Sequence, residues 1–368
     1  MYRISGKLQQ YAWGIPGGLA AWHDGKSGGP EAELWFGAHL NGPSPLVDSP
    51  DKTLADVAGV ENVPLLVKLL AADRPLSIQI HPPTDQAEAR FAQQQADPSL
   101  EKLLADPLAK TEMLIALYPF SILQGLREPS LAIGILDGLG GTAAEAASLL
   151  GSGDVKGAIR ILLGMSAEEL VDLDERLPAV AAAAGLDPSG IEALTIVARD
   201  YPGDPGVLVA SIMGQLVMSE GEAVYVEAGV VHAYITGIGV EVMTASDNVL
   251  RLGLTPKVVA VDEALEALQP QLLPQLMQPG PQLLANGGSL RSYEPHDAPF
   301  DVQWLHSGTA TYPSGHYRFV LCVSGSTTVT GGGESLTLAP GQAAAVLAAE
   351  PEVEVSATAS AFTARSAN

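Results

Sequence analysis

Cysteine is nearly absent from the sequence, and this absence bears on where the protein works. Cys322 is the single cysteine, so the chain cannot form an internal disulfide. The opening segment MYRISGKLQQ also lacks the basic head and following apolar stretch of a secretory signal. We therefore expect a protein of the reducing cytoplasm.

Basic residues and long apolar runs are scarce as well. Lysine and arginine number 19 against 42 acidic residues, giving a formal net charge of -23. Because no basic stripe offsets this charge, nucleic-acid binding is not expected. No apolar run reaches the roughly 18 residues of a membrane helix, so we expect no membrane association. The 368 residues, 47% hydrophobic and 17% charged, fit a folded multidomain enzyme.

The segment PLSIQIH, residues 75–81, carries the first chemically informative pattern. In a strand, Ser77, Gln79 and His81 share one face, while the apolar residues between them share the other. The strand ends at Pro82-Pro83, which places His81 at a strand terminus, where binding groups reach a pocket mouth. We expect this polar face to hold a ligand.

Two more segments carry charged residues among apolar ones. The run AKTEMLIAL predicts a strand with Lys110 and Glu112 on one face. Much later, GVVHAYITGIGVEVMTASDNVLRLGLTPK contains a larger polar set, namely His232, Glu241, Asp247, Arg251 and Lys257. We expect these segments to converge on one shared site.

The candidate metal ligands are Gln79, His81, Glu112 and His232. Two imidazoles with carboxylate and amide oxygens suit a borderline cation such as zinc, and a catalytic site would leave one position open. The same spacing also fits histidines that only make hydrogen bonds at strand ends. Spacing and composition alone favour that simpler interpretation.

Five motifs in order give the chain a specific resemblance. They are YAWG (residues 11–14), AELWFGAH (32–39), PLLVKLL (64–70), PLSIQIHP (75–82) and ASDNVLRLGLTPK (245–257). This pattern resembles the type I mannose-6-phosphate isomerases, zinc-dependent cupin enzymes, from the N-terminus to about residue 260. The resemblance implies one zinc ion per chain, with ligands at Gln79, His81, Glu112 and His232.

The resemblance also implies the residues around the metal. The implied catalytic residues are Arg251, Glu241, Asp247 and Lys110, and the implied substrate-binding residues are Trp13, Glu33, Lys68, Ser77 and Lys257. Because the acidic chain repels an anionic substrate globally, local cations must capture a phosphate. Lys68 interrupts the apolar run of residues 63–72, where a merely solubilising charge would be badly placed.

Two segments depart from the family pattern. Relatives usually read His-Lys-Pro-Glu before the third ligand, whereas this chain has Ala109 and Thr111 around Lys110. The missing imidazole puts catalytic efficiency and substrate identity in question. Pro83 replaces the usual acidic residue after the His-Pro of the metal strand, a change that we interpret as structural.

The predicted fold is mainly β with a helical insertion: two cupin-type jelly-roll β-barrels plus an α-helical domain. Residues 1–125 and 205–268 would form the catalytic jelly roll, and residues 283–368 a metal-free one. Helical spacing indicates the insertion at residues 126–204. Helix starts are signalled by Ser166 and by Asp187-Pro188, and a stop by Gly185. Residues 269–282 form a Pro-rich connector.

Other apparent motifs are set aside. Gly25-Lys26-Ser27 resembles the end of a phosphate-binding loop, but Ala20 replaces the required glycine. The glycines at 331–333 predict a hairpin turn. His296, His306 and His316 are interpreted as structural or surface residues, because the C-terminal third lacks a ligand set.

The resulting hypothesis is an aldose-ketose isomerase that interconverts mannose 6-phosphate and fructose 6-phosphate through an enediol. Zinc and Arg251 would stabilise negative charge on sugar oxygens, and Glu241 or Asp247 would carry the proton. One alternative is a decayed metal- and sugar-phosphate-binding cupin. Another is a two-His, one-carboxylate iron site, against which Gln79 argues. A monomer is expected, with oligomers left open.

Overall fold

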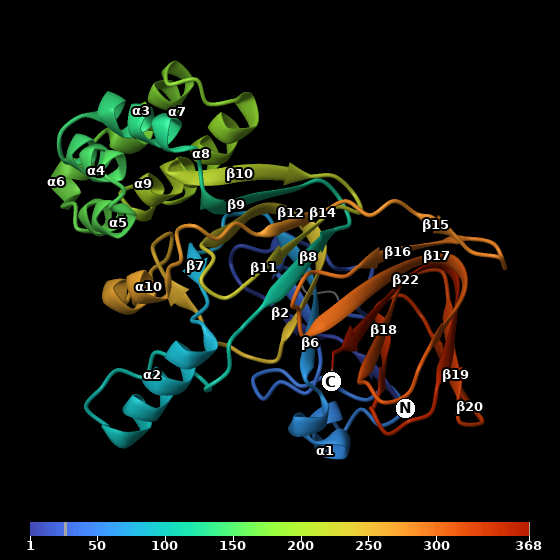
Figure 1. Cartoon of the computed structure of the whole chain (residues 1–368). Helices are drawn as coiled ribbons and strands as arrows, with labels where there is room; N and C mark the ends of the chain where they lie inside the picture. Colours follow the sequence, from blue (N-terminus) through green and yellow to red (C-terminus); the bar gives the residue numbers. More distant parts are fainter. Residues whose placement is uncertain (26–27, 368) are drawn as a thin grey trace.

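The computed structural model describes residues 1–25 and 28–367. Lys26 and Ser27 of the tripeptide set aside above lie outside the described residues. The described chain is mainly β, with two large antiparallel sheets and a group of helices at one end (Figure 1). None of the described helices combines the length and apolarity that crossing a membrane requires. The prediction of a mainly β fold with helices inserted is confirmed.

The first large sheet carries the predicted site. Its main path runs in the order β14 (Gln275–Met277), β11 (Ala223–Val226), β8 (Glu112–Ala116), β12 (His232–Thr244), β6 (Leu65–Ala72), β5 (Glu33–Phe36) and β2 (Lys7–Gln9). Four further strands attach to this path, namely β7 (Gln79–Ile80), β9 (Phe120–Leu126), β10 (Met213–Met218) and β13 (Leu250–Arg251).

The long strand β12 changes partners halfway along its length. Its first half pairs with β7 and β9, and its second half with β6 and β8. The register with β9 shifts between Tyr234 and Thr236, and Gly237 follows with a φ of 140°. Side chains nine residues apart on a regular strand point to opposite faces, so this irregularity lets His232 and Glu241 serve one pocket.

The second large sheet belongs mostly to the C-terminal third. It contains, in order, β1 (Tyr2–Ser5), β21 (Gln342–Val346), β18 (Arg318–Ser324), β22 (Val353–Ser366), β17 (Phe300–Tyr312), β16 (Ser289–Tyr293) and β15 (Gln282–Leu283), with β19 (Thr327–Gly331) and β20 (Glu334–Leu338) attached. The N-terminal strand β1 therefore pairs far along the chain, with β21. The β19–β20 turn contains Gly332 and Gly333 at positive φ, which confirms the predicted hairpin.

Over the residues described, strand pairing does not close either large sheet into a barrel. The prediction of a mainly β fold therefore holds, but the two predicted jelly-roll barrels are not shown by the strand pairing. A small third sheet joins β3 (Ile15–Pro16) to β4 (Pro30–Glu31). Four of the described helical segments lie outside the group of helices at one end: α1 (Leu54–Ala58), the 3-10 helix η1 (Val60–Asn62), α2 (Thr84–Ala96) and α10 (Val261–Ala267).

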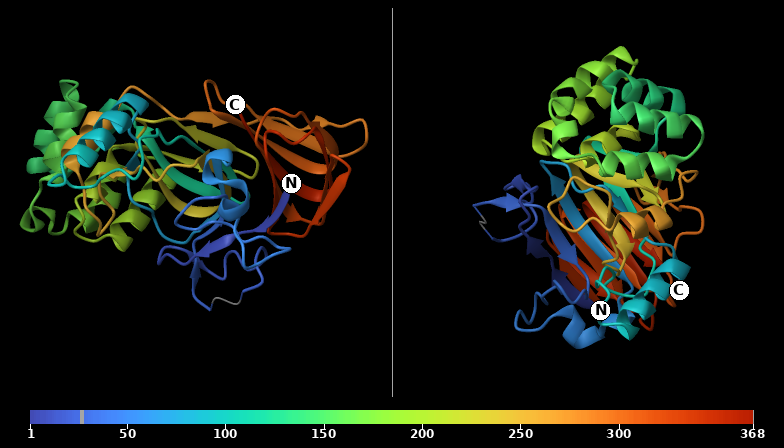
Figure 2. Two further views of the ribbon diagram at one scale, coloured as in Figure 1. Left: turned by 90° about the horizontal axis from the view of Figure 1, so that it is seen from below. Right: turned by 90° about the vertical axis from the view of Figure 1, so that its left-hand side faces the viewer.

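The predicted helical insertion forms a compact group at one end of the molecule (Figures 1 and 2). Residues 126–204 contain α3 (Pro129–Leu139), α4 (Thr142–Gly151), α5 (Val155–Leu163), α6 (Ala167–Leu170), α7 (Leu173–Ala183) and α8 (Pro188–Asp200). The helical group continues past the predicted boundary with α9 (Gly206–Ser211). Ser166 caps α6, and the Asp187 carboxylate accepts hydrogen bonds from backbone amides at the start of α8. These predicted starts are confirmed, and Gly185 follows α7 at a φ of 94°.

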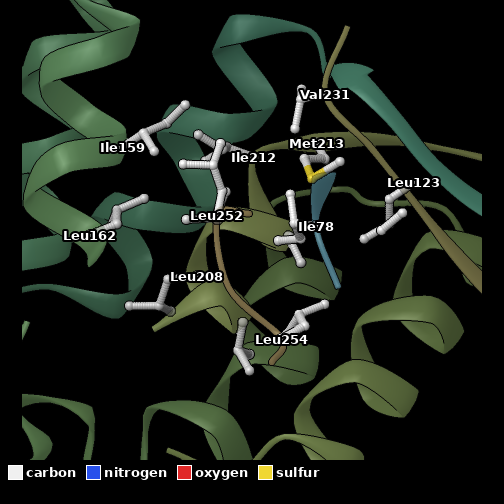
Figure 3. Packing of buried hydrophobic residues seen from close by; sticks show 14 of the residues in the cluster. Ile78, Leu123, Ile159, Leu162, Leu208, Ile212, Met213, Val231, Leu252 and Leu254 are labelled. Carbon is white, nitrogen blue, oxygen red and sulfur yellow. The ribbon is translucent and has the colours of Figure 1, made fainter. Parts of the chain in front are cut away.

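Apolar contacts fasten the helices and sheets together. Ile159, Leu162 and Leu208 of the helices belong to one cluster with Ile78 and Leu252 of the site region (Figure 3). A second cluster joins β6 and β8 of the first sheet to β17, β18 and β22 of the second. The metal strand β7 is therefore backed by the helical group, and the first sheet by the second.

Candidate metal centre and substrate pocket

Three of the predicted metal ligands converge within the first sheet. One donor atom from each of His81, Glu112 and His232 lies within 4.8 Å of the others. His81 Nε2 is 3.3 Å from Glu112 Oε2, and His232 Nε2 is 2.9 Å from Glu112 Oε1. All three side chains are buried. His232 lies on β12 directly opposite Gln79 on β7, which brings the fourth predicted ligand beside the group.

Backbone carbonyls orient both imidazoles. His81 Nδ1 lies 2.8 Å from the Asn248 carbonyl oxygen, and His232 Nδ1 lies 3.1 Å from that of Val230. Since each carbonyl can only accept, each Nδ1 carries a proton, and in the neutral ring this leaves the lone pair on Nε2. Carbonyl partners of this kind fix the tautomer of metal-binding histidines.

The charge states suit a cation site. Burial and the nearby Lys110 lower the pKa of His81 to about 4, so its ring is neutral at neutral pH. Burial alone would raise the pKa of Glu112, but Lys110 and the two imidazoles together lower it well below its usual range. The Lys110 ammonium is 2.8 Å from Glu112 Oε2. The Glu112 carboxylate and the neutral His81 imidazole therefore face one another, with His232 beside them.

His81 Nε2 and Glu112 Oε2 are buried and make no hydrogen bond among the described residues, although Glu112 Oε2 forms an ion pair with Lys110. Buried polar atoms without hydrogen bonds are costly, and here they are the atoms that a metal would bind. Nitrogen and oxygen donors in this combination match the ligand preferences of zinc. The residues present therefore fit a zinc ion, with His81, Glu112 and His232 as the compact set and Gln79 adjacent.

A pocket of about 780 Å³ opens above this group. All the predicted site residues except His81 line it; His81 is fully buried below. These lining residues are Trp13, Glu33, Lys68, Ser77, Gln79, Lys110, Glu112, His232, Glu241, Asp247, Arg251 and Lys257. The pocket thus brings together segments more than 200 residues apart in the sequence, since both Tyr11 and Pro256 line it.

Lys68 is held between two carboxylates in the pocket wall. Its ammonium lies 2.8 Å from Glu241 and 3.4 Å from Glu33. Burial alone would lower the pKa of Lys68, but the two carboxylates raise it above its usual value. The ammonium also lies 5.4 Å from the ring centroid of Trp35, whose indole N–H donates to Glu33. Lys68 therefore stays protonated, with its charge partly neutralised.

Asp247 is positioned by a second set of contacts. Its Oδ2 accepts a hydrogen bond of 2.8 Å from Asn41 and lies 3.2 Å from His39 Nε2. Although burial raises its pKa, the His39 and Asn41 contacts, with the charge of Lys68, lower it overall. Asp247 is therefore an ionised carboxylate that reaches the open pocket with 30% of its side chain exposed.

Further positive charge lines the same pocket. Arg251 is half-buried and makes no ion pair among the described residues, and burial lowers the pKa of its guanidinium. Lys257 is exposed and also lines the pocket, as does Arg74. These cations compensate the acidic charge of the chain locally.

Several pocket residues were not predicted from the sequence. Tyr234 is buried, and its hydroxyl donates a hydrogen bond of 3.1 Å to Glu112 Oε1. Burial, with the charges of Glu112 and Glu241, raises the pKa of Tyr234 well above its usual value. Its position two residues after His232 in a strand was the available signal, since such residues share a face. Asn41, and His39 outside the pocket lining, gave no comparable signal, because their partner Asp247 is remote in sequence. Arg74 gave none either.

The departures from the usual motif lie at the edge of this site. Ala109 is absent from the pocket lining, and its carbonyl accepts a hydrogen bond from the Thr244 hydroxyl. The Thr111 amide donates to the same hydroxyl. Thr244 thus fixes the backbone on both sides of Lys110.

Comparisons with known proteins match this chain to one protein family. A family model described as phosphomannose isomerase type I, catalytic domain, matches residues 1–129. Mannose-6-phosphate isomerase of Escherichia coli K12 is 30% identical, over 96% of this chain and 97% of its own. The human enzyme of the same name is 32% identical, over 73% of each chain.

Solved structures agree with the sequence matches. Mannose 6-phosphate isomerase from Salmonella typhimurium, bound to fructose 6-phosphate and zinc, superposes with a TM-score of 0.82. The match is 26% identical and covers 100% of this chain and 99% of that one. A further structure of mannose 6-phosphate isomerase, bound with zinc and yttrium, also has a TM-score of 0.82.

The fold and site together define a mainly β protein with a candidate metal centre beneath a charged pocket. More particularly, the chain belongs to the mannose-6-phosphate isomerase family. The resemblance drawn from the sequence motifs is confirmed.

Proposed function

We propose that this protein interconverts mannose 6-phosphate and fructose 6-phosphate by moving a proton between C2 and C1 through an enediol. The carrying observation is the compact His81, Glu112 and His232 group at the base of a pocket that also holds free cations and an ionised carboxylate. Zinc bound by these residues and Gln79 would supply a Lewis acid for the sugar oxygens.

Arg251 is assigned to stabilise the negative charge that develops on the enediolate oxygens. It is unpaired among the described residues and half-buried, so its charge is available and poorly screened. Lys110 lies against the metal group and is assigned to donate a hydrogen bond during ring opening. Lys257 and Arg74, at the more exposed part of the pocket, are assigned to the phosphate.

Asp247 is the better proton carrier of the two carboxylates considered. Glu241 is 2% exposed and forms an ion pair with Lys68 at 2.8 Å, so its carboxylate is already engaged by a cation. Asp247 is ionised, oriented by His39 and Asn41, and open to the pocket. A general base must be unprotonated and within reach of the carbon acid. We assign Glu241 and Glu33 to hold Lys68, and Trp13 and Ser77 to line the sugar site.

The finer architecture is part of the same proposal. We infer that each large sheet is folded as a cupin-type jelly roll, supported by the several partners of β12 and of β22. The proposed catalytic unit remains residues 1–125 and 205–268, with a helical insertion at 126–204 and a C-terminal unit at 283–368. The proposed connector at 269–282 contributes the strand β14 to the first sheet. We further propose a cytoplasmic location, as the cysteine content suggested, and a monomer, with oligomers left open.

The direct test is an assay of fructose 6-phosphate formation from mannose 6-phosphate by the wild type, Arg251→Ala and Arg160→Ala. Arg160 lies on α5 with 55% of its side chain exposed and serves as the matched control. We expect Arg251→Ala to lose about 2–4 kcal/mol of transition-state stabilisation in kcat/KM, by analogy with removal of an oxyanion donor, and Arg160→Ala to retain activity. Full activity of a folded Arg251→Ala variant would remove Arg251 from the mechanism.

A further inference from the structure

The loop that ends at Lys257 has an unusual backbone where it enters the catalytic pocket. This loop, residues 253–257, follows β13, and its last four residues line the pocket; we call it the Lys257 loop. Leu254 is 1% exposed and has a φ of 54°, and Gly253 before it has a φ of 121°. A bulky residue at positive φ is strained and persists only where its surroundings fix it. The Lys257 loop therefore requires anchoring contacts.

The helical group supplies an anchor from the turn at residues 201–205, between α8 and α9. The Asp204 carboxylate of this turn accepts two backbone hydrogen bonds. Its Oδ1 is 2.7 Å from the Gly206 amide nitrogen, and its Oδ2 is 3.1 Å from the Thr255 amide nitrogen, 51 residues further along the chain. Hydrogen bonds that an ionised carboxylate accepts are stronger than those between neutral groups. Asp204 therefore ties the helical group to the Lys257 loop.

Further hydrogen bonds extend this connection along the loop. The Thr255 hydroxyl accepts a hydrogen bond of 3.1 Å from the Lys257 amide. At the start of the loop, the Gly253 carbonyl accepts a hydrogen bond of 3.1 Å from the amide of Ile78, just before β7. The Lys257 loop is thus bonded at its start to the segment that carries the metal ligands, and at its middle to Asp204.

Two glycines let the backbones of the turn and the loop come close together. A Cβ added at Gly206 would lie 2.7 Å from the Gly253 Cα, and a Cβ added at Gly253 would collide with the Gly206 Cα. Only glycine allows this approach without displacing the backbone. Leu254 also shares an apolar cluster with Leu208 of α9 (Figure 3). The hydrogen bond from Thr255 to Asp204 therefore lies beside a tight contact between α9 and the loop.

We propose that Asp204 is a positioning residue for the substrate phosphate and acts through the Lys257 loop. Asp204 itself is not among the residues that line the catalytic pocket. Its carboxylate holds Thr255, and Thr255 fixes the backbone of Lys257 at the pocket. Arg251 is held separately, because β13 pairs with β7. The inference rests on the proposed function, in which Lys257 is assigned to the phosphate.

The test compares the wild type with Asp204→Asn and Asp174→Asn, all loaded with zinc. The asparagine amide keeps the volume of the carboxylate at residue 204 but can accept only one of the two hydrogen bonds. Asp174 of α7 is the matched control. Its carboxylate accepts a hydrogen bond from the Gly203 amide of the same turn, but within the described chain it accepts none from the Lys257 loop.

We expect the KM for mannose 6-phosphate to rise about tenfold in Asp204→Asn, as loss of one hydrogen bond to a charged group implies. The Kd for mannose 6-phosphate, measured by calorimetry, should rise by the same factor. The value of kcat should change little, because Arg251 and the metal group are held by other contacts. Asp174→Asn should match the wild type in all three quantities.

Three outcomes would overturn the role of Asp204 while leaving the isomerase assignment intact. One is an unchanged KM and Kd in Asp204→Asn. Another is a lower kcat at the wild-type KM and Kd, because partial unfolding reduces the active fraction without changing the affinity. The third is an equal rise of KM in Asp174→Asn, because loosening of the turn would then suffice.

Failure of the proposed function gives a different result. A wild type that binds mannose 6-phosphate but forms no fructose 6-phosphate would contradict the isomerase assignment. The Kd of Asp204→Asn would then still decide the role of Asp204, with a tenfold rise supporting it and no rise overturning it. A wild type that does not bind mannose 6-phosphate would overturn both proposals.

Discussion

At the scale of single residues, the metal centre depends on side chains that are not themselves ligands. The carbonyls of Asn248 and Val230 fix the imidazoles, and Tyr234 and Lys110 contact Glu112. The grouping of His81, Glu112 and His232 could be predicted from the sequence, because the resemblance to the family implies these residues and strand alternation is consistent with it. Their supporting contacts could not, because they join segments brought together only by folding.

Tyr234→Phe tests one of these supporting contacts. The substitution removes the hydroxyl that donates to Glu112 while keeping the buried ring. We expect zinc affinity or kcat to fall about tenfold. This is the lower end of the decrease that follows when a residue hydrogen-bonded to a metal ligand is removed. Zinc titration against a competing chelator and steady-state kinetics would measure both. Wild-type values for both quantities would show that the hydroxyl does not support Glu112.

His39→Ala tests the control of Asp247. His39 helps to lower the pKa of this carboxylate, so its removal should raise that pKa. If Asp247 acts as the base, activity requires its ionised form and falls as pH drops through its pKa. The acidic limb of kcat/KM against pH should therefore move to higher pH in His39→Ala. An unmoved limb, measured alongside His296→Ala as control, would argue against Asp247 as the base.

At the scale of elements, the decisive feature is the partner change along β12. The sequence shows the apolar and polar alternation of this segment, but the register shift after Tyr234 depends on pairing with β9, which alternation does not encode. The sequence therefore predicted that His232 and Glu241 share a site, but it did not explain how both side chains reach the same face of the sheet. The helix starts at Ser166 and Asp187, in contrast, rest on local capping and could be predicted.

Gly237→Ala should disturb β12. An added Cβ would approach Phe120 to 2.5 Å, and the φ of 140° disfavours any side chain. We expect a loss of about 2–3 kcal/mol in the free energy of unfolding, from overpacking and backbone strain together. Urea denaturation would measure it. Gly280→Ala, where no atom lies within 4 Å of the added Cβ, is the control, and equal stability of both variants would contradict the proposed role of Gly237.

At the scale of the whole molecule, the site is assembled by contacts that cross the predicted divisions. The β1 strand pairs with β21 of the second sheet, and an apolar cluster joins the two sheets. Composition changes along the chain indicated the helical segment, but sequence order could not reveal that the first strand belongs with the last third. Such long-range pairing leaves no local signature.

Metal removal should weaken this assembly as a whole. A ligand that binds only the folded chain stabilises it, and the metal group joins β7, β8 and β12. We expect the unfolding temperature to fall on chelation and to return on adding zinc. A His232→Ala variant should show a much smaller response to zinc. Identical melting of the stripped and zinc-loaded wild type would indicate that the His81, Glu112 and His232 group does not bind zinc in the folded protein.

The most direct test of the central claim is fructose 6-phosphate formation from mannose 6-phosphate by protein stripped with chelator and then resupplied with zinc. We expect activity to disappear on stripping and to return in proportion to bound zinc, up to one ion per chain. A folded, zinc-loaded protein that binds the sugar phosphate but forms no product would contradict the assignment as an isomerase. It would leave a sugar-phosphate-binding protein with an imidazole missing at Ala109.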